Sequence, residues 1–232
     1  MTHFLFNAMK HAVLMATTVL LGACASGPRP PDWQIEAKGS MERSVAAYLQ
    51  GNPRVASAEL ARARSQLSRT GRADLLATAE LLHCAARVAS LVFEPCAGFE
   101  PLRFDATQAQ HAYVDYLRGQ VTAENIPLLP EAQRGPARGD ADVLNSIADP
   151  LAQLLAAAVL LQTGRASPAV ITQAIDTASR QGWRRPLLAW LGVQAQRAEQ
   201  GGDADAAARL RRRIAIAQEI SPAVQEPEKE KP

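Results

Sequence analysis

The positions of proline and glycine constrain the fold of this chain more than any other feature of its sequence. Three capping residues stand directly before a proline, in Asn52-Pro53, Asp149-Pro150 and Ser167-Pro168. This order is typical of the first turn of an α-helix. Glycines then recur where helices of ordinary length would end in a left-handed cap. These glycines are Gly51, Gly71, Gly119, Gly164, Gly182 and Gly201. No strand-like alternation of apolar residues is found, so the sequence predicts an all-α fold.

Apolar residues between these positions recur at helical spacing and indicate about eight helices. The helices are expected over residues 33–50, 53–69, 72–91, 105–119, 149–163, 168–181, 186–200 and 204–219. Most connections are short, so consecutive helices should pack as antiparallel hairpins. Only 5% of the residues are aromatic, and runs of alanine at inward positions indicate close helix packing instead.

The last hairpin resembles a tetratricopeptide repeat. It has Leu191, Ala195 and Ala198 on its first helix, Gly202-Asp203 at its turn, Ala207 on its second helix and Pro222 beyond it. The resemblance implies a stacked, TPR-like array with a concave surface for a protein partner. Trp190 lies one position from the family's aromatic residue, so a general array of α-hairpins is an equally good description.

Residues 1–23 have the composition of a signal peptide. Lys10 supplies positive charge, and the apolar stretch 12–21 is too short to cross a bilayer as a helix. An ordinary secretory signal, cleaved after Ala23 or Ala25, is one interpretation.

The end of this segment, Leu21-Gly22-Ala23-Cys24, resembles the lipobox of bacterial lipoproteins. The resemblance implies cleavage before Cys24, a diacylglyceryl group on its thiol, acylation (palmitate) of its amino group and anchoring in a lipid bilayer. Ala25 stands where an aspartate would signal inner-membrane retention, which implies the periplasmic face of the outer membrane. Residues 24–32 would then form a proline-rich tether.

Two segments interrupt the helical pattern. Residues 93–104 contain three phenylalanines with proline and glycine, which indicates a compact loop held by its own aromatic side chains. Residues 120–140 are expected to form a long Pro/Gly loop that separates an N-terminal helical half, 33–119, from a C-terminal half, 141–220. An ordered flap over the concave face is the alternative. The charged, proline-rich residues 221–232 should be disordered.

Cys84 and Cys96 are the two other cysteines of the chain. In an oxidising compartment such a pair usually forms a disulfide. Pro95 and Gly98 permit the chain reversal that the bond requires, so a Cys84–Cys96 bridge is expected. The alternative is one core cysteine and one loop cysteine, both free.

Enzyme and cofactor signatures are absent from the sequence. The mature chain has two histidines, His83 and His111, and no CxxC or HxxxH spacing, so no metal and no cofactor are expected. No GxSxG or phosphate-binding glycine loop occurs. The net charge of +2 argues against nucleic acid as a partner.

The one basic concentration is found near the C-terminus. Arg209, Arg212 and Arg213, with Arg211 between them, form a candidate patch for an anionic partner. Arg184 and Arg185 lie upstream. A solvated helix face is the simpler interpretation of this patch.

These features together favour a non-catalytic helical-repeat scaffold or adaptor, anchored at the outer membrane and bound to a periplasmic or outer-membrane protein partner. Two alternatives are a peptidoglycan hydrolase with a glutamate as general acid and a carrier of lipid or another small ligand.

Overall fold

A computed structural model of the chain describes residues 30–219, and all its regular secondary structure is helical. The α-helices are α2 (Asp32–Gln50), α3 (Pro53–Ser68), α4 (Ala73–Ala89), α5 (Gln108–Leu117), α6 (Glu131–Arg138), α7 (Pro150–Gln162), α8 (Pro168–Arg180), α9 (Arg184–Gln200) and α10 (Ala204–Gln218). Three short 3-10 helices are η1 (Glu100–Asp105), η2 (Ala123–Leu128) and η3 (Asp142–Ser146). None of the helices in this part of the chain has the length and apolar character needed to cross a membrane.

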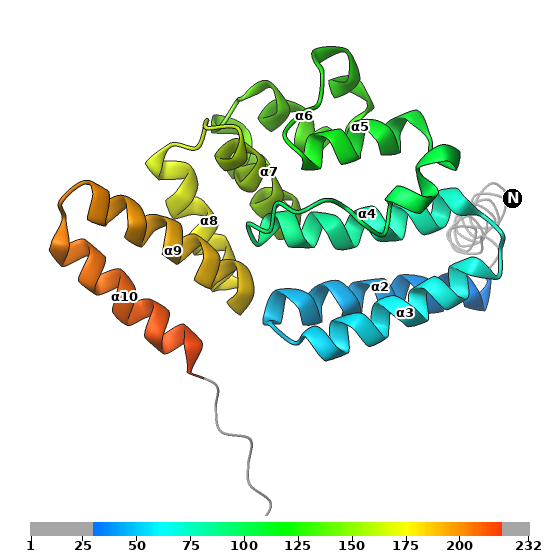
Figure 1. Cartoon of the computed structure of the whole chain (residues 1–232), viewed down its shortest axis with the longest axis horizontal. Helices are drawn as coiled ribbons and strands as arrows, with labels where there is room; N and C mark the ends of the chain where they lie inside the picture. The colour runs from blue at the N-terminus through cyan, green and yellow to red at the C-terminus, as the bar shows by residue number, and fades with distance from the viewer. Residues whose placement is uncertain (1–29, 220–232) are drawn as a thin grey trace, which may run out of the picture.

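The helices form antiparallel hairpins stacked in an array, as Figure 1 shows, so the predicted fold class is confirmed. Of the three residues predicted to cap a helix before a proline, Asp149 and Ser167 do so: each side chain accepts a hydrogen bond from the backbone N–H three residues later, as does that of Asp203. The prediction is wrong for Asn52, whose side chain makes no capping hydrogen bond at the start of α3. The glycine that closes α9 is Gly202, with φ +75°, and not Gly201, which keeps a right-handed backbone.

The predicted start of α5 is wrong by three residues. Residues 100–105 form η1, and the capping box of α5 pairs Thr107 with Gln110. Asp105 and Gln108 offer the same spacing, but the chain uses the second pair because Asp105 still belongs to the preceding turn.

Residues 120–140 are not a long loop. They contain η2 and α6, and Ile126 and Leu129 are buried in the main core. The buried Gln133 of α6 accepts a hydrogen bond from the Tyr116 hydroxyl and donates one to the carbonyl oxygen of Ala152 at 3.0 Å. This bridge holds the segment against both α5 and α7, so it joins the two regions that it was expected to separate.

One hydrophobic core runs from α4 to α10, and a second cluster lies between α2, α3 and α4. Ala156, Ala157 and Ala158 are all buried, which lets neighbouring helices approach closely. Trp190 of α9 is fully buried, and its indole N–H donates to the carbonyl oxygen of Ala89 at 3.2 Å.

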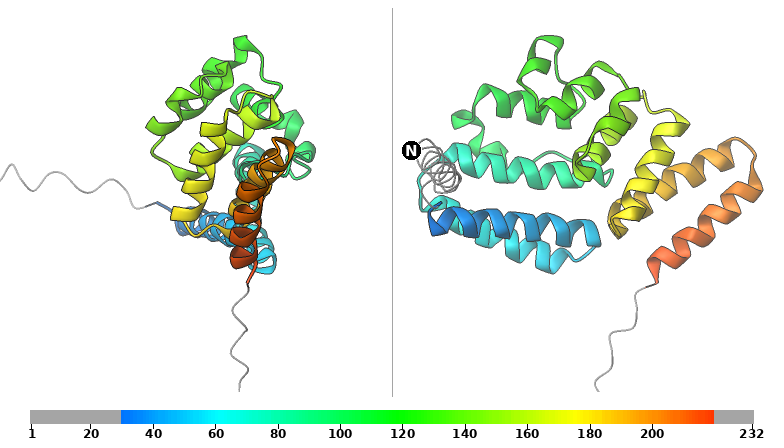
Figure 2. Two further views of the ribbon diagram at one scale, coloured as in Figure 1. Left: turned by 90° about the vertical axis from the view of Figure 1, so that its left-hand side faces the viewer. Right: turned by 180° about the vertical axis from the view of Figure 1, so that it is seen from behind.

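The first helix of the array, α2, also contacts α9, the helix before the last. Trp183 packs against a small cluster of Val45, Leu49 and Ala86. In the view from behind in Figure 2, α9 reaches the end of the α2–α3 hairpin. The array is therefore a short closed arc.

Candidate functional site

A groove at the C-terminal end of the array brings arginine and apolar side chains together. Helices α8 and α10 both pack on α9, and the space between them has a volume of about 550 Å³. We call it the basic groove; it is lined by Pro168, Ile171, Gln194, Arg197, Ala198, Ala206, Arg209, Leu210 and Arg213.

The geometry of the α9–α10 hairpin places the arginines. Asp203 begins α10 by accepting a hydrogen bond from the N–H of Ala206 at 2.8 Å. Arg197 and Arg209 stand six residues before and after Asp203, so the antiparallel hairpin sets them opposite each other. Arg213 follows Arg209 by one turn on the same face. Leu210 lies between them and is buried at the floor.

The basic groove carries positive charge without a carboxylate partner. Among residues 30–219, no Asp or Glu forms an ion pair with Arg197, Arg209 or Arg213. Arg197 donates one hydrogen bond to the carbonyl oxygen of Ala166 at 3.3 Å. Three guanidinium groups over an apolar floor therefore suit a ligand with both carboxylates and apolar side chains.

Only part of the predicted arginine patch lies in the basic groove. Arg209 and Arg213 line the basic groove, whereas Arg212 is exposed and does not. Arg211 is paired with Glu199. Sequence reasoning missed Arg197, although its position relative to the Gly202-Asp203 turn was sufficient to place it opposite Arg209.

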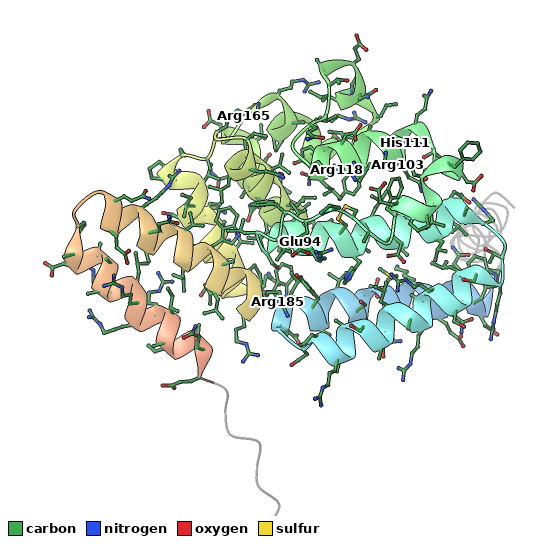
Figure 3. All side chains as sticks on the ribbon, in the orientation of Figure 1. Glu94, Arg103, His111, Arg118, Arg165 and Arg185 are labelled. Carbon is green, nitrogen blue, oxygen red and sulfur yellow. A yellow bond between two sulfur atoms is a disulfide. The ribbon has the colours of Figure 1, made fainter. Side chains whose placement is uncertain are left out.

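Arg185 does not line the basic groove. It links α9 to α2 instead. Its Nε donates to the carbonyl oxygen of Tyr48 at 2.9 Å, and its guanidinium carbon lies 4.4 Å from the centre of the Tyr48 ring. Figure 3 shows Arg185 near Glu94, which is ion-paired with Arg87. Burial raises the pKa of Tyr48. This cluster connects the two ends of the arc.

Cys84 and Cys96 are joined by a disulfide, with their Cα atoms 5.5 Å apart. Both residues are buried. The bond fixes the segment after α4 against that helix. Of the three phenylalanines in this region only Phe99 is buried, while Phe104 is 97% exposed, so the expectation of a loop held by several of its own aromatic residues is wrong. The disulfide and Phe99 hold it instead.

A second polar cluster lies over this loop and α5. Glu100 accepts hydrogen bonds from Arg103, at 2.9 Å, and from Arg118. These guanidinium groups, Arg103 first, hold the pKa of Glu100 below its ordinary value. Figure 3 shows Arg103, Arg118 and His111 on neighbouring elements. The ring of His111 packs edge-on against Phe99, 6.2 Å between centres.

The buried carboxylates are held by arginine. Glu59 accepts hydrogen bonds from Arg43 and Arg62, and the bond from Arg43 lowers its pKa. Such a carboxylate stays ionised at neutral pH and is unsuited to act as a general acid. Glu80 is paired with Arg64 through two hydrogen bonds.

His83 is a half-buried histidine whose Nδ1 atom is buried without a polar partner within the described chain. Burial lowers its pKa. Its ring packs edge-on against Tyr48. No group of three His, Cys, Asp or Glu side chains among residues 30–219 is placed to hold a metal ion.

Cys24 and its lipobox lie outside the residues that the structure describes, as does the tail 221–232. The chain matches no protein-family model, no curated protein and no solved structure. The basic groove is therefore the main structural indication of function.

Proposed function

We propose that this protein is an outer-membrane lipoprotein, anchored at the periplasmic face through Cys24, that acts as a non-catalytic scaffold or adaptor for an envelope protein complex. The observation that carries the proposal is the basic groove. Its ligand is an acidic segment of a protein partner that also presents apolar side chains.

The lining of the basic groove favours binding over chemistry. Arg197, Arg209 and Arg213 are its only ionisable side chains, and arginine stays protonated at any physiological pH. Guanidinium groups recognise carboxylates through paired hydrogen bonds. Ile171 and Leu210 offer an apolar surface between them, which adds shape and area to the contact.

The anchor explains how the scaffold would be held near its partner. Several acyl chains on Cys24 would give stable attachment, because each buried CH₂ contributes about 0.8 kcal/mol. Residues 24–32 can span at most about 30 Å. The helical array would then remain close to the membrane, with the basic groove open to the periplasm.

Affinity capture tests the binding part of the proposal. The protein is captured from mild detergent extracts, and co-purifying proteins are quantified by mass spectrometry. We expect one envelope protein to co-purify with the wild type and to fall at least tenfold with the double variant Arg209→Glu, Arg213→Glu. Arg212→Glu is the matched control, because it reverses a charge on the same helix outside the groove. Recovery of the protein alone, or equal losses with Arg212→Glu, would contradict the proposal.

The anchor is tested separately by the mass of the N-terminal peptide of the mature protein. We expect a peptide that starts at Cys24 and carries a diacylglyceryl group. A peptide that starts at Ala25 or later would contradict the lipoprotein assignment and would leave the groove test intact.

A further inference from the structure

A second groove lies at the opposite end of the array, where α2 begins. It has a volume of about 360 Å³. We call it the tether groove; it is lined by Trp33, Ala37 and Met41 of α2, Leu67 of α3 and Leu75, Ala79 and Leu82 of α4, with Gln34, Lys38, Glu42 and Thr78 at its rim. In Figure 1 the start of α2 lies far from α8–α10, so this site is separate from the basic groove.

The tether groove is apolar and incompletely covered. Ala37, Met41, Leu67 and Ala79 are buried at its floor, but the walls formed by Trp33, Leu75 and Leu82 are only half-buried. Sequence periodicity places Leu75 and Leu82 on the core face of α4 together with Ala79. They instead remain partly open to solvent, because no further helix among residues 30–219 covers this face.

Three of the four polar side chains at the rim, those of Lys38, Glu42 and Thr78, have partners. Lys38 is ion-paired with Glu42 at 3.8 Å. The Thr78 hydroxyl donates to the carbonyl oxygen of Asp74 at 3.0 Å and accepts from the Gln110 amide at 2.9 Å. The groove walls are helices, and beyond the first turn of each helix their backbone groups bond to one another.

These walls suit a ligand without polar groups. An extended peptide in this groove would leave its own backbone N–H and C=O groups without partners, which is unfavourable away from water. A hydrocarbon chain has no such groups. From Trp33 to Met41 the groove follows α2 for about 12 Å, which is close to the thickness of one leaflet of bilayer hydrocarbon, about 15 Å.

The position of the groove indicates which hydrocarbon chain reaches it. Trp33, which lines the groove, is nine residues after Cys24. Nine residues can span up to about 30 Å, so a chain attached to Cys24 can return over the first turns of α2. The covalent link also gives that chain a high effective concentration at the groove.

We propose that the tether groove binds one long acyl chain of the lipid-modified Cys24. This inference rests on the lipoprotein part of the proposed function and is independent of the basic groove. One acyl chain would lie along α2 between Trp33 and Met41, while the remaining chains stay in the membrane.

The chemistry of the groove is tested with a fluorescent fatty acid, cis-parinaric acid, and a protein that begins at Ala25. This protein keeps every helix and core cluster described above, since all of them follow residue 31. We expect saturable binding at one site, weakened at least tenfold by Leu75→Glu. Ile216→Glu is the control, because Ile216 is 70% exposed on α10, far from the groove. The absence of saturable binding, or equal weakening by both variants, would overturn the proposal.

The source of the acyl chain is tested in the full-length, lipid-modified protein. The photo-crosslinking residue p-benzoylphenylalanine replaces Leu75, and in the control it replaces Ile216. We expect irradiation to link position 75, and not position 216, to the acylated peptide that starts at Cys24. If position 75 is linked only to phospholipid or to another protein, the proposal is overturned. The lipid modification of Cys24 is not affected by that result. A Cys24 without lipid overturns both this inference and the anchor.

Discussion

Among the glycines of residues 30–219, Gly98 has the closest neighbouring side chain. A Cβ atom built at this position would overlap the Glu80 carboxylate, with its Cδ at 2.7 Å. Glu80 cannot move aside, because it is buried and held by two hydrogen bonds from Arg64. A glycine is required here by close packing and not by its backbone angles, since Gly98 is not among the glycines with positive φ.

The variant Gly98→Ala should therefore lower the free energy of unfolding by about 1–3 kcal/mol, the usual cost of overpacking. Urea denaturation measures the change. The control is Gly192→Ala in α9, where an added Cβ meets nothing within 4 Å; this change should raise the stability of the helix by about 0.5–1 kcal/mol. Equal effects of the two variants would contradict the packing that we describe.

His83 makes stability depend on pH in a range where few other groups titrate. Burial lowers its pKa in the folded protein, so the unfolded chain binds the proton more readily. Stability is then fully present above the pKa of the unfolded state and is lost as the pH falls toward the folded pKa.

We expect the free energy of unfolding to fall as the pH drops below about 6.5, the ordinary pKa of histidine, and the variant His83→Gln to remove most of that slope. Carboxylates such as Glu59, whose pKa is lowered by Arg43, lose their contribution only below about pH 4.5. The two effects are therefore separable in denaturation curves measured across pH. A slope in His83→Gln equal to that of the wild type would assign the effect to another group.

The role of a residue could be predicted from the sequence where that role depends only on its neighbours along the chain. The caps at Asp149 and Ser167 act as expected, because a cap depends on its own first turn, although Asn52 forms no such bond. Arg197, Arg185 and Gln133 acquire their roles from partners on other helices, and a single sequence does not state which helices meet.

At the scale of elements, the apolar periodicity of the sequence predicts the long helices but not the short ones. The eight predicted helices are present, with most boundaries within two residues. The short helix α6 contains Gly135 and Pro136, residues that break isolated helices. It is stabilised by burial of Gln133, Pro136 and Ala137 against its neighbours, so local propensity predicts a loop where packing produces a helix.

The disulfide should stabilise the segment after α4. It closes a loop with a sequence separation of 12, and a crosslink over such a loop contributes about 2–3 kcal/mol. We expect the double variant Cys84→Ala, Cys96→Ala to lose about this amount in urea denaturation. Alkylation of the unfolded wild type provides the control, measured by mass: Cys84 and Cys96 should take no label before reduction and one label each afterwards. Two labelled cysteines in the unreduced protein would show that the bond is absent.

At the scale of the whole molecule, the array carries two grooves that lie far apart. One is basic and the other is apolar. The basic groove depends on α8–α10, and the tether groove depends on α2–α4. The contact of Arg185 with Tyr48 and the hydrogen bond from Trp190 to Ala89 connect these regions. The sequence predicts the hairpins but not the closure of the arc, because closure joins residues more than a hundred positions apart.

The arrangement assigns the two ends different tasks in our account. We propose that the end that begins with α2 faces the anchor and that the end formed by α9 and α10 presents arginines to a partner. The central claim is that an acidic protein segment occupies the basic groove while the protein is anchored in the cell envelope.

In-cell photo-crosslinking from the groove tests this claim most directly. The residue p-benzoylphenylalanine replaces Gln194, which lines the basic groove, or Gln196, an exposed glutamine on the same helix that does not. Our account predicts that irradiation links position 194 to one envelope protein, through an acidic segment, and leaves position 196 unlinked. No link from position 194, or the same links from both positions, would contradict it.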